Sequence, residues 1–139
     1  MEQKENRVVL RGTVAGEAVL SHQVHGIDFY RFPLAVPRLS GREDLLNILF
    51  PLSSPETALP QAGAFVEVTG EIRSFNNRSG VGNKLVVSVF AKTLFQATGE
   101  EDENWLELAG TLCKPPALRS TPLGRTICDM ILAVNRRYG

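Results

Sequence analysis

The chain has 139 residues, of which 15 are Lys or Arg and 15 are Asp or Glu, so its formal net charge at pH 7 is zero. This length fits one ordinary domain with its own apolar core, and the balanced charge excludes a protein that is basic overall, although a neutral total can hide a basic face. No apolar run is long enough to span a membrane, and no secretory apolar region follows Met1. We therefore expect a cytoplasmic protein in which Cys113 and Cys128 are reduced thiols that pack as small buried side chains.

Apolar and β-branched runs predict five strands in the first 98 residues. The runs cover residues 7–14, 29–36, 45–50, 64–73 and 84–91. Gly12 and Gly70 interrupt the first and the fourth run, and an interior glycine is typical of a strand that bends sharply or carries a bulge. In the second run, every second residue from Tyr30 to Val36 is apolar, which predicts one shared face.

Polar segments rich in Pro, Gly or Asn separate these runs. Residues 21–28 predict a polar connection between the first two strands, and residues 76–83 predict the tip of a hairpin. Residues 53–63 begin like a helix, but Pro60 leaves room only for a short helix or a turn. Residues 99–104 read as an acidic linker.

The chain contains an internal repeat with an offset of 98 residues, because the segment 6–41 aligns without gaps on the segment 104–139. The matching residues are glycines, apolar residues, one threonine and one arginine, namely Leu10, Gly12, Thr13, Leu20, Gly26, Leu34, Ala35, Val36, Arg38 and Gly41 with their counterparts 98 positions later. We therefore expect a whole unit in residues 1–98, the linker, and the first two strands of a second unit in residues 105–139.

Five strands, a short helical segment between the third and fourth, and glycines inside the first and fourth are typical of an OB-fold barrel. The residues also carry a family likeness. The run Asn-Arg-Val-Val-Leu-Arg-Gly-Thr-Val at 6–14 and the run Leu-Ala-Val-Asn-Arg-Arg at 132–137 resemble the bacterial single-stranded DNA-binding protein family and its relative, primosomal replication protein N. The resemblance implies a non-enzymatic protein that binds single-stranded DNA, largely without sequence preference, in DNA replication, repair and recombination.

A protein that holds single strands needs aromatic rings on which bases stack and cations for the phosphates. Phe75 is the best stacking candidate because it leads into the hairpin tip, where Arg73, Arg78 and Lys84 supply cations. An ordinary solvated hairpin is an equally good interpretation of this pattern. Phe32 and Phe65 are expected in the core.

Four further residues are weaker candidates for nucleic-acid contact. The family resemblance gives Phe50 a contact with the DNA strand, whereas its sequence context fits a core side chain equally well. Arg31, Arg38 and Arg42 could continue the phosphate track, although surface arginines near loops are common.

The sequence indicates neither an enzyme nor a cofactor site. His22 and His25 lie on the polar connection with no Cys or paired carboxylates nearby, so a plain turn is the expectation, and no catalytic triad can be proposed. The rival to DNA binding is an OB-fold module for protein assembly, favoured by the neutral charge. Because two strands alone are marginal in water, we also expect association into dimers or tetramers through residues 105–139.

Overall fold

The structure is a computed structural model that describes residues 6–52, 59–76 and 85–135, with backbone only at residues 75 and 76. The chain divides into two compact units, one of residues Arg7–Leu106 and one that combines Met1–Asn6 with Glu107–Gly139. Strands are the regular elements throughout the described residues, which contain no helix. The predicted all-β class is therefore confirmed, and no helix in this part of the chain is long and apolar enough to cross a membrane.

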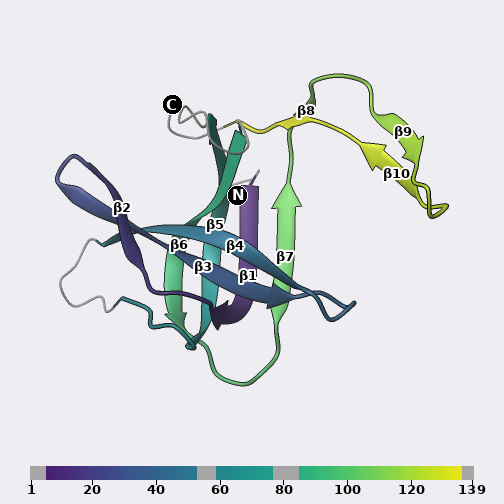
Figure 1. Ribbon diagram of the computed structural model, residues 1–139. Helices are drawn as coiled ribbons and strands as arrows, with labels where there is room; N and C mark the ends of the chain where they lie inside the picture. The colour runs from purple at the N-terminus through teal and green to yellow at the C-terminus, as the bar shows by residue number, and fades with distance from the viewer. Residues whose placement is uncertain (1–5, 53–58, 77–84, 136–139) are drawn as a thin grey trace, which may run out of the picture. The chain divides into compact units, whose positions relative to one another are not determined.

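The first unit is built on one mixed sheet with the strand order β2-β3-β4-β6-β5-β1-β7 (Figure 1). Its strands are β1 (Asn6–Val14), β2 (Val19–Val24), β3 (Ile27–Pro37), β4 (Glu43–Leu52), β5 (Phe65–Asn76), β6 (Leu85–Gln96) and β7 (Glu103–Leu108). From β2 to β1 the neighbours are antiparallel except β4 and β6, which pair in parallel through Ile48 with Val89 and Leu49 with Phe90. Each of the five predicted strands overlaps one of these elements.

The end of β1 also pairs with β3, so the strands β3, β4, β6, β5 and β1 form a ring of pairings, which we call the strand ring. Glycines make this geometry possible. A Cβ on Gly12 would overlap the carbonyl oxygen of Ala35 in β3, and one on Gly70 would overlap that of Phe90 in β6. The register between β5 and β6 shifts at Thr69 and Gly70, as a bulge does. Both interior glycines thus stand where backbones approach closely.

The core lies inside the strand ring and is made of alternate residues from its five strands. Its buried members are Val8, Leu10, Val14, Phe32, Leu34, Val36, Ile48, Phe50, Val66, Val68, Val89 and Ala91. The predicted core face of the second strand is confirmed, because Phe32 is buried and Tyr30 packs against the cluster. The expectation for Phe65 was wrong: it is half-buried, and its neighbour Val66 occupies the core-facing position.

Two connections differ from the expectation. Residues 21–24 belong to β2, which forms a hairpin with β3 through a turn in which His25 and Gly26 have positive φ angles of 50° and 78°. All six side chains of β2 are exposed, so the strand carries no apolar alternation. Of the predicted short helix, residues 53–58 lie outside the described residues, and residues 59–63 contain a turn and no helix.

The second unit contains two small antiparallel pairs, β8 (Thr111–Leu112) with β11 (Leu132–Ala133) and β9 (Ala117–Ser120) with β10 (Thr126–Asp129). Four of their six pairings repeat a pairing of the first unit at the offset of 98, and the other two differ because β2 and β3 shift register between Leu20 and His22. Leu132 pairs with Leu112 as Leu34 pairs with Val14. That this unit opens a second OB-fold stays a prediction.

The expectation that the two cysteines are buried was wrong. Cys113 and Cys128 are free thiols and both are exposed, not buried.

Candidate nucleic-acid interface

A row of stacked side chains crosses the outer face of the strand ring and the β2–β3 hairpin. His22 on β2 lies flat on Phe29 of β3, with ring centroids 4.8 Å apart and an interplanar angle of 4°. Phe29 meets Phe90 of β6 at 5.9 Å, and the guanidinium of Arg73 on β5 lies 3.9 Å from the centroid of Phe90. We call these four residues the aromatic row.

Strand alternation places the row outside the core. Tyr30 and Val89 pack on or in the core cluster, so their neighbours Phe29 and Phe90 belong to the opposite face. The strand register then brings distant residues into line. Leu49 of β4 pairs with Arg31 of β3 on one side and with Phe90 on the other, and Phe90 pairs with Glu71 of β5. Arg31, Phe90 and Glu71 therefore lie on one line across four strands, with Phe29 beside it.

The phenylalanines of the row are half-buried, whereas His22 is exposed. Flat, partly exposed rings on a sheet are the surfaces on which unpaired bases stack. Arg73 adds a cation beside them, and an arginine over a ring is held in place by its attraction to the π-system. The arrangement can therefore offer a base a ring and a phosphate a nearby positive charge.

The carboxylate of Glu71 partly neutralises the positive charge of this face. Glu71 forms ion pairs with Arg73 at 2.7 Å and with Lys92 at 3.7 Å. The face consequently has two cations that share one anion, plus the exposed Arg31. A strand of DNA would compete with Glu71 for both partners, which limits the electrostatic contribution to binding.

The predicted hairpin arm is only partly described. Arg73 is in the aromatic row. Phe75 lies in β5 opposite Val86, two residues beyond Arg73, but its side chain is outside the described part. Arg78 and Lys84 also lie outside the described residues. Their roles in binding stay predictions.

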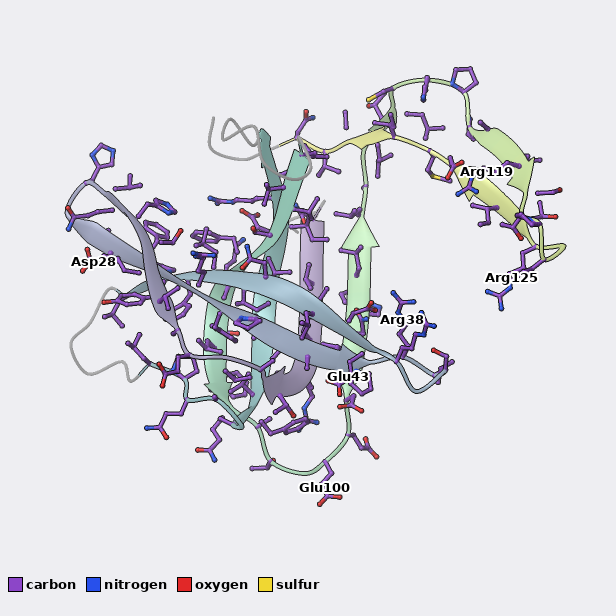
Figure 2. All side chains as sticks on the ribbon, viewed as in Figure 1. Asp28, Arg38, Glu43, Glu100, Arg119 and Arg125 are labelled. Atoms are coloured by element: carbon purple, nitrogen blue, oxygen red, sulfur yellow. The ribbon has the colours of Figure 1, made fainter. Side chains whose placement is uncertain are left out.

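The other predicted residues are scattered. Phe50 is 3% exposed and packs against Phe32 with ring centroids 5.7 Å apart, so its burial fits the core interpretation that the sequence left open. Arg38 and Arg42 flank the turn that joins β3 to β4, and Arg38 lies at the same end of this hairpin as Glu43 (Figure 2). The turn follows the end of β3 at Pro37, whereas the aromatic row crosses β3 at Phe29. Arg31 lies in line with the row, because it pairs with Leu49, which pairs with Phe90.

Arg38 is already engaged. Its Nε donates to both carboxylate oxygens of Asp44 at 2.9 Å, and a terminal nitrogen donates to one of them at 2.5 Å. The hydrogen bond and the charge of Asp44 raise the pKa of the Arg38 guanidinium, and the hydrogen bond from Arg38 lowers the pKa of Asp44. Arg38 thus stabilises the turn. Arg42 is also exposed, and its side chain takes no part in this ion pair.

A second aromatic surface lies over β1, β5 and β7. Arg7 stands 5.5 Å from the ring centroid of Trp105, and Arg11 stands 5.4 Å from that of Phe65. Arg11 also pairs with Glu67 at 3.6 Å. Among the described residues, Phe65 and Trp105 stack on no other ring, so this surface lacks the continuous set of rings that the aromatic row has and is the weaker candidate.

Sequence reasoning missed Phe29, Phe90 and His22. The signal for Phe29 was present, since it precedes the core-facing run that starts at Tyr30 and must face outward. His22 could not be placed because the exposed β2 has no periodic pattern. Among the described residues, no group of three or more His, Cys, Asp or Glu side chains could hold a metal ion.

Comparison with known proteins gives structural neighbours. The dimeric N-terminal domain of PriB protein from Thermoanaerobacter tencongensis has 32% sequence identity and a TM-score of 0.59, over 69% of this chain and 100% of that chain. Wild-type single-stranded DNA-binding protein from Thermus aquaticus has 25% identity and a TM-score of 0.76, over 95% of this chain and 69% of that chain.

A deletion variant of the same Thermus aquaticus protein has a TM-score of 0.74 at 25% identity. No protein-family model and no curated protein matches the sequence.

Proposed function

Because this chain belongs to the family of OB-fold proteins that includes bacterial single-stranded DNA-binding protein and PriB, we propose that it binds single-stranded DNA through the aromatic row. The observation that carries the proposal is the set of rings of His22, Phe29 and Phe90, which line up with Arg73 on the outer face of the strand ring. Bases stack on the exposed parts of these rings. Stacking of this kind contributes about 1 to 3 kcal/mol per base and tolerates any base, so binding is largely independent of sequence.

Phosphate contacts come from the cations around the row. Arg31 and Lys92 are exposed, and Arg73 is partly exposed beside Phe90. If these three each neutralise one phosphate, the logarithm of the binding constant falls with the logarithm of the salt concentration with a slope of about −2. The hairpin residues Phe75, Arg78 and Lys84 extend the same track in this proposal.

The experiment is fluorescence anisotropy of a labelled oligo-thymidine strand, titrated with the full chain at low and at high salt. Phe90→Ala weakens binding about fivefold or more, because a stacking ring is worth at least about 1 kcal/mol. Phe95→Ala is the matched control, since Phe95 is an exposed aromatic on the same strand at 51% exposure and makes no ring contact among the described residues. Equal effects of the two substitutions, or no binding at low salt, would refute the aromatic row as the binding site.

The cellular role follows the family in this proposal. The chain acts as a non-enzymatic DNA-binding protein of the cytoplasm in replication, repair or recombination, and it works as a homo-oligomer. The PriB neighbour is itself described as dimeric, which supports the oligomer.

A second candidate function is protein assembly without strong DNA binding. The observation that favours it is the pairing of Glu71 with both Arg73 and Lys92, which leaves the row with little free positive charge. Salt separates the two candidates, because phosphate binding weakens steeply as salt rises whereas an apolar protein interface does not.

A further inference from the structure

His22 lies in the aromatic row because of a bulge in β2. The register between β2 and β3 shifts between Leu20 and His22, so that His22 pairs with Phe29. Without the shift, Ser21 would pair with Phe29, and His22 would pair with Asp28. Because paired residues point to the same face of a sheet, the bulge turns the imidazole toward the rings of the row and away from the carboxylate of Asp28.

The second unit shows the same hairpin without the bulge. Its strands β9 and β10 repeat β2 and β3 in sequence at the offset of 98, and Ser120 pairs there with Thr126. These two residues stand 98 positions after His22 and Asp28. The shift is therefore a feature of the first hairpin, in which it brings a histidine to the aromatic row.

The contacts of the His22 ring leave one nitrogen open to a ligand. The ring lies flat on Phe29, and its Nδ1 is 3.0 Å from the hydroxyl oxygen of Ser21. The other nitrogen, Nε2, has no hydrogen-bond partner among the described residues, and the side chain is exposed. Asp28, on the other face, accepts a hydrogen bond from Gln23 at 2.8 Å. A ligand can therefore reach Nε2 without displacing a protein group.

The charged groups on the outer face near His22 are mainly cations. They are Arg31 on β3, Glu71 and Arg73 on β5, and Lys92 on β6, while β4 places the uncharged Pro51 opposite Phe29. The carboxylate of Glu71 is already paired with both Arg73 and Lys92. A protonated His22 thus has no free carboxylate beside it among the described residues. A phosphate of bound DNA would supply the missing anion.

We propose that protonated His22 is a phosphate contact of the aromatic row, so that binding of single-stranded DNA is linked to the uptake of a proton. This inference rests on the DNA binding proposed above. In the imidazolium both ring nitrogens donate, Nδ1–H to the hydroxyl of Ser21 and Nε2–H to a phosphate oxygen. The ring of Phe29 stacks on the neutral form and also attracts the charged form.

Linkage fixes the direction of the effect. Because DNA favours the protonated ring, the protonated ring favours DNA to the same extent, and binding tightens as the pH falls through the range near 6.5 in which histidine ordinarily titrates. One added contact to an exposed charge should raise the affinity for oligo-thymidine about three- to fivefold between about pH 7.5 and pH 5.5. The slope of the salt dependence should also become steeper by about 0.7, because one more phosphate is neutralised.

The test is the anisotropy titration of oligo-thymidine with the full chain at about pH 5.5, 6.5 and 7.5, with a label that does not respond to pH. His22 and His25 are the two histidines of the chain, and thymine does not titrate in this range. His22→Phe retains a ring to stack on Phe29 but cannot take up a proton, so it should lose both the pH dependence and the steeper salt slope. His22→Arg carries a permanent cation and should bind equally well at all three pH values.

His25→Asn is the matched control. His25 lies in the turn of the same hairpin at a φ angle of 50°, which asparagine tolerates, and this variant should keep the pH dependence. A wild-type affinity that is equal at all three pH values, or a pH dependence that His22→Phe retains, would overturn the proton linkage but leave the proposed DNA binding standing. Absence of binding at every pH would overturn the proposed function and this inference with it.

Discussion

Substitution of Gly12 by alanine probes the pairing that joins the two ends of the strand ring. A Cβ at this position would overlap the carbonyl oxygen of Ala35 and lie 3.2 Å from a methyl carbon of Val36. Because the first obstacle is backbone, no side-chain rotation relieves the overlap, and β1 must move away from β3. The pairs of Thr13 with Ala35 and of Val14 with Leu34 would then be weakened.

The magnitude follows from what this movement exposes. Val14 is 1% exposed, and full burial of a valine is worth about 1.5 to 3 kcal/mol, while overpacking of a filled site costs about 1 to 3 kcal/mol. A movement of β1 relieves the overpacking but exposes part of Val14, so the two costs do not add in full. We therefore expect Gly12→Ala to lower the free energy of unfolding by about 2 to 4 kcal/mol. The melting temperature should fall by about 10 °C.

Urea unfolding measures this loss through the fluorescence of Trp105, the single tryptophan of the chain, which contacts Arg7 of β1. Thr13→Ala is the matched control: Thr13 is exposed on the same strand, so its loss should cost less than about 1 kcal/mol. A Gly12→Ala variant whose free energy of unfolding stays within about 0.5 kcal/mol of the wild type would refute the close approach of β1 and β3.

Three further predictions concern the charges and the core. Glu71→Gln should tighten binding of oligo-thymidine about two- to fivefold in the anisotropy assay, because it frees Arg73 for a phosphate; weaker binding would count against competition between Glu71 and DNA. The pKa of Asp44 lies below its ordinary value of 3.8, so the stabilising pair with Arg38 is fully present above that pH and is lost as the pH falls through the lowered pKa. An NMR titration of the Asp44 carboxyl carbon should show this low midpoint, and an ordinary midpoint would contradict the pairing. Phe32→Ala should cost about 3 to 5 kcal/mol in thermal or urea unfolding, since Phe32 is 1% exposed at the centre of the core; a loss below about 1 kcal/mol would contradict that position.

Local pattern predicted the five strands of the ring because burial of one face imposes alternation on each of them. Gly12 and Gly70 could be assigned to sharp bends for the same local reason, and the structure adds which backbone each one meets. By contrast, β2 was missed because all its side chains are exposed, so nothing in its sequence departs from a polar connection. The turn at His25 and Gly26 pairs β2 with β3, and no pattern within β2 itself indicates this pairing.

The candidate site was predictable only in part, because it depends on register between strands. Arg73 could be named from its place before the hairpin tip, but its position over Phe90 depends on how β5 and β6 align across the shift at Gly70. Phe65 shows the converse error, since a shift of one position moves a side chain from the core to the outer face. The prediction of buried cysteines failed because it was based on the general burial of reduced thiols, which does not depend on the surroundings of these two positions.

The most direct test of the central claim is ultraviolet cross-linking of an oligo-thymidine strand to the full chain, followed by peptide mapping of the modified residues. Binding through the aromatic row predicts adducts at Phe29 and Phe90, which high salt and unlabelled competitor strand reduce in parallel. Adducts confined to Phe65, Phe95 or Trp105, with Phe29 and Phe90 unmodified, would place the DNA away from the aromatic row and contradict the account.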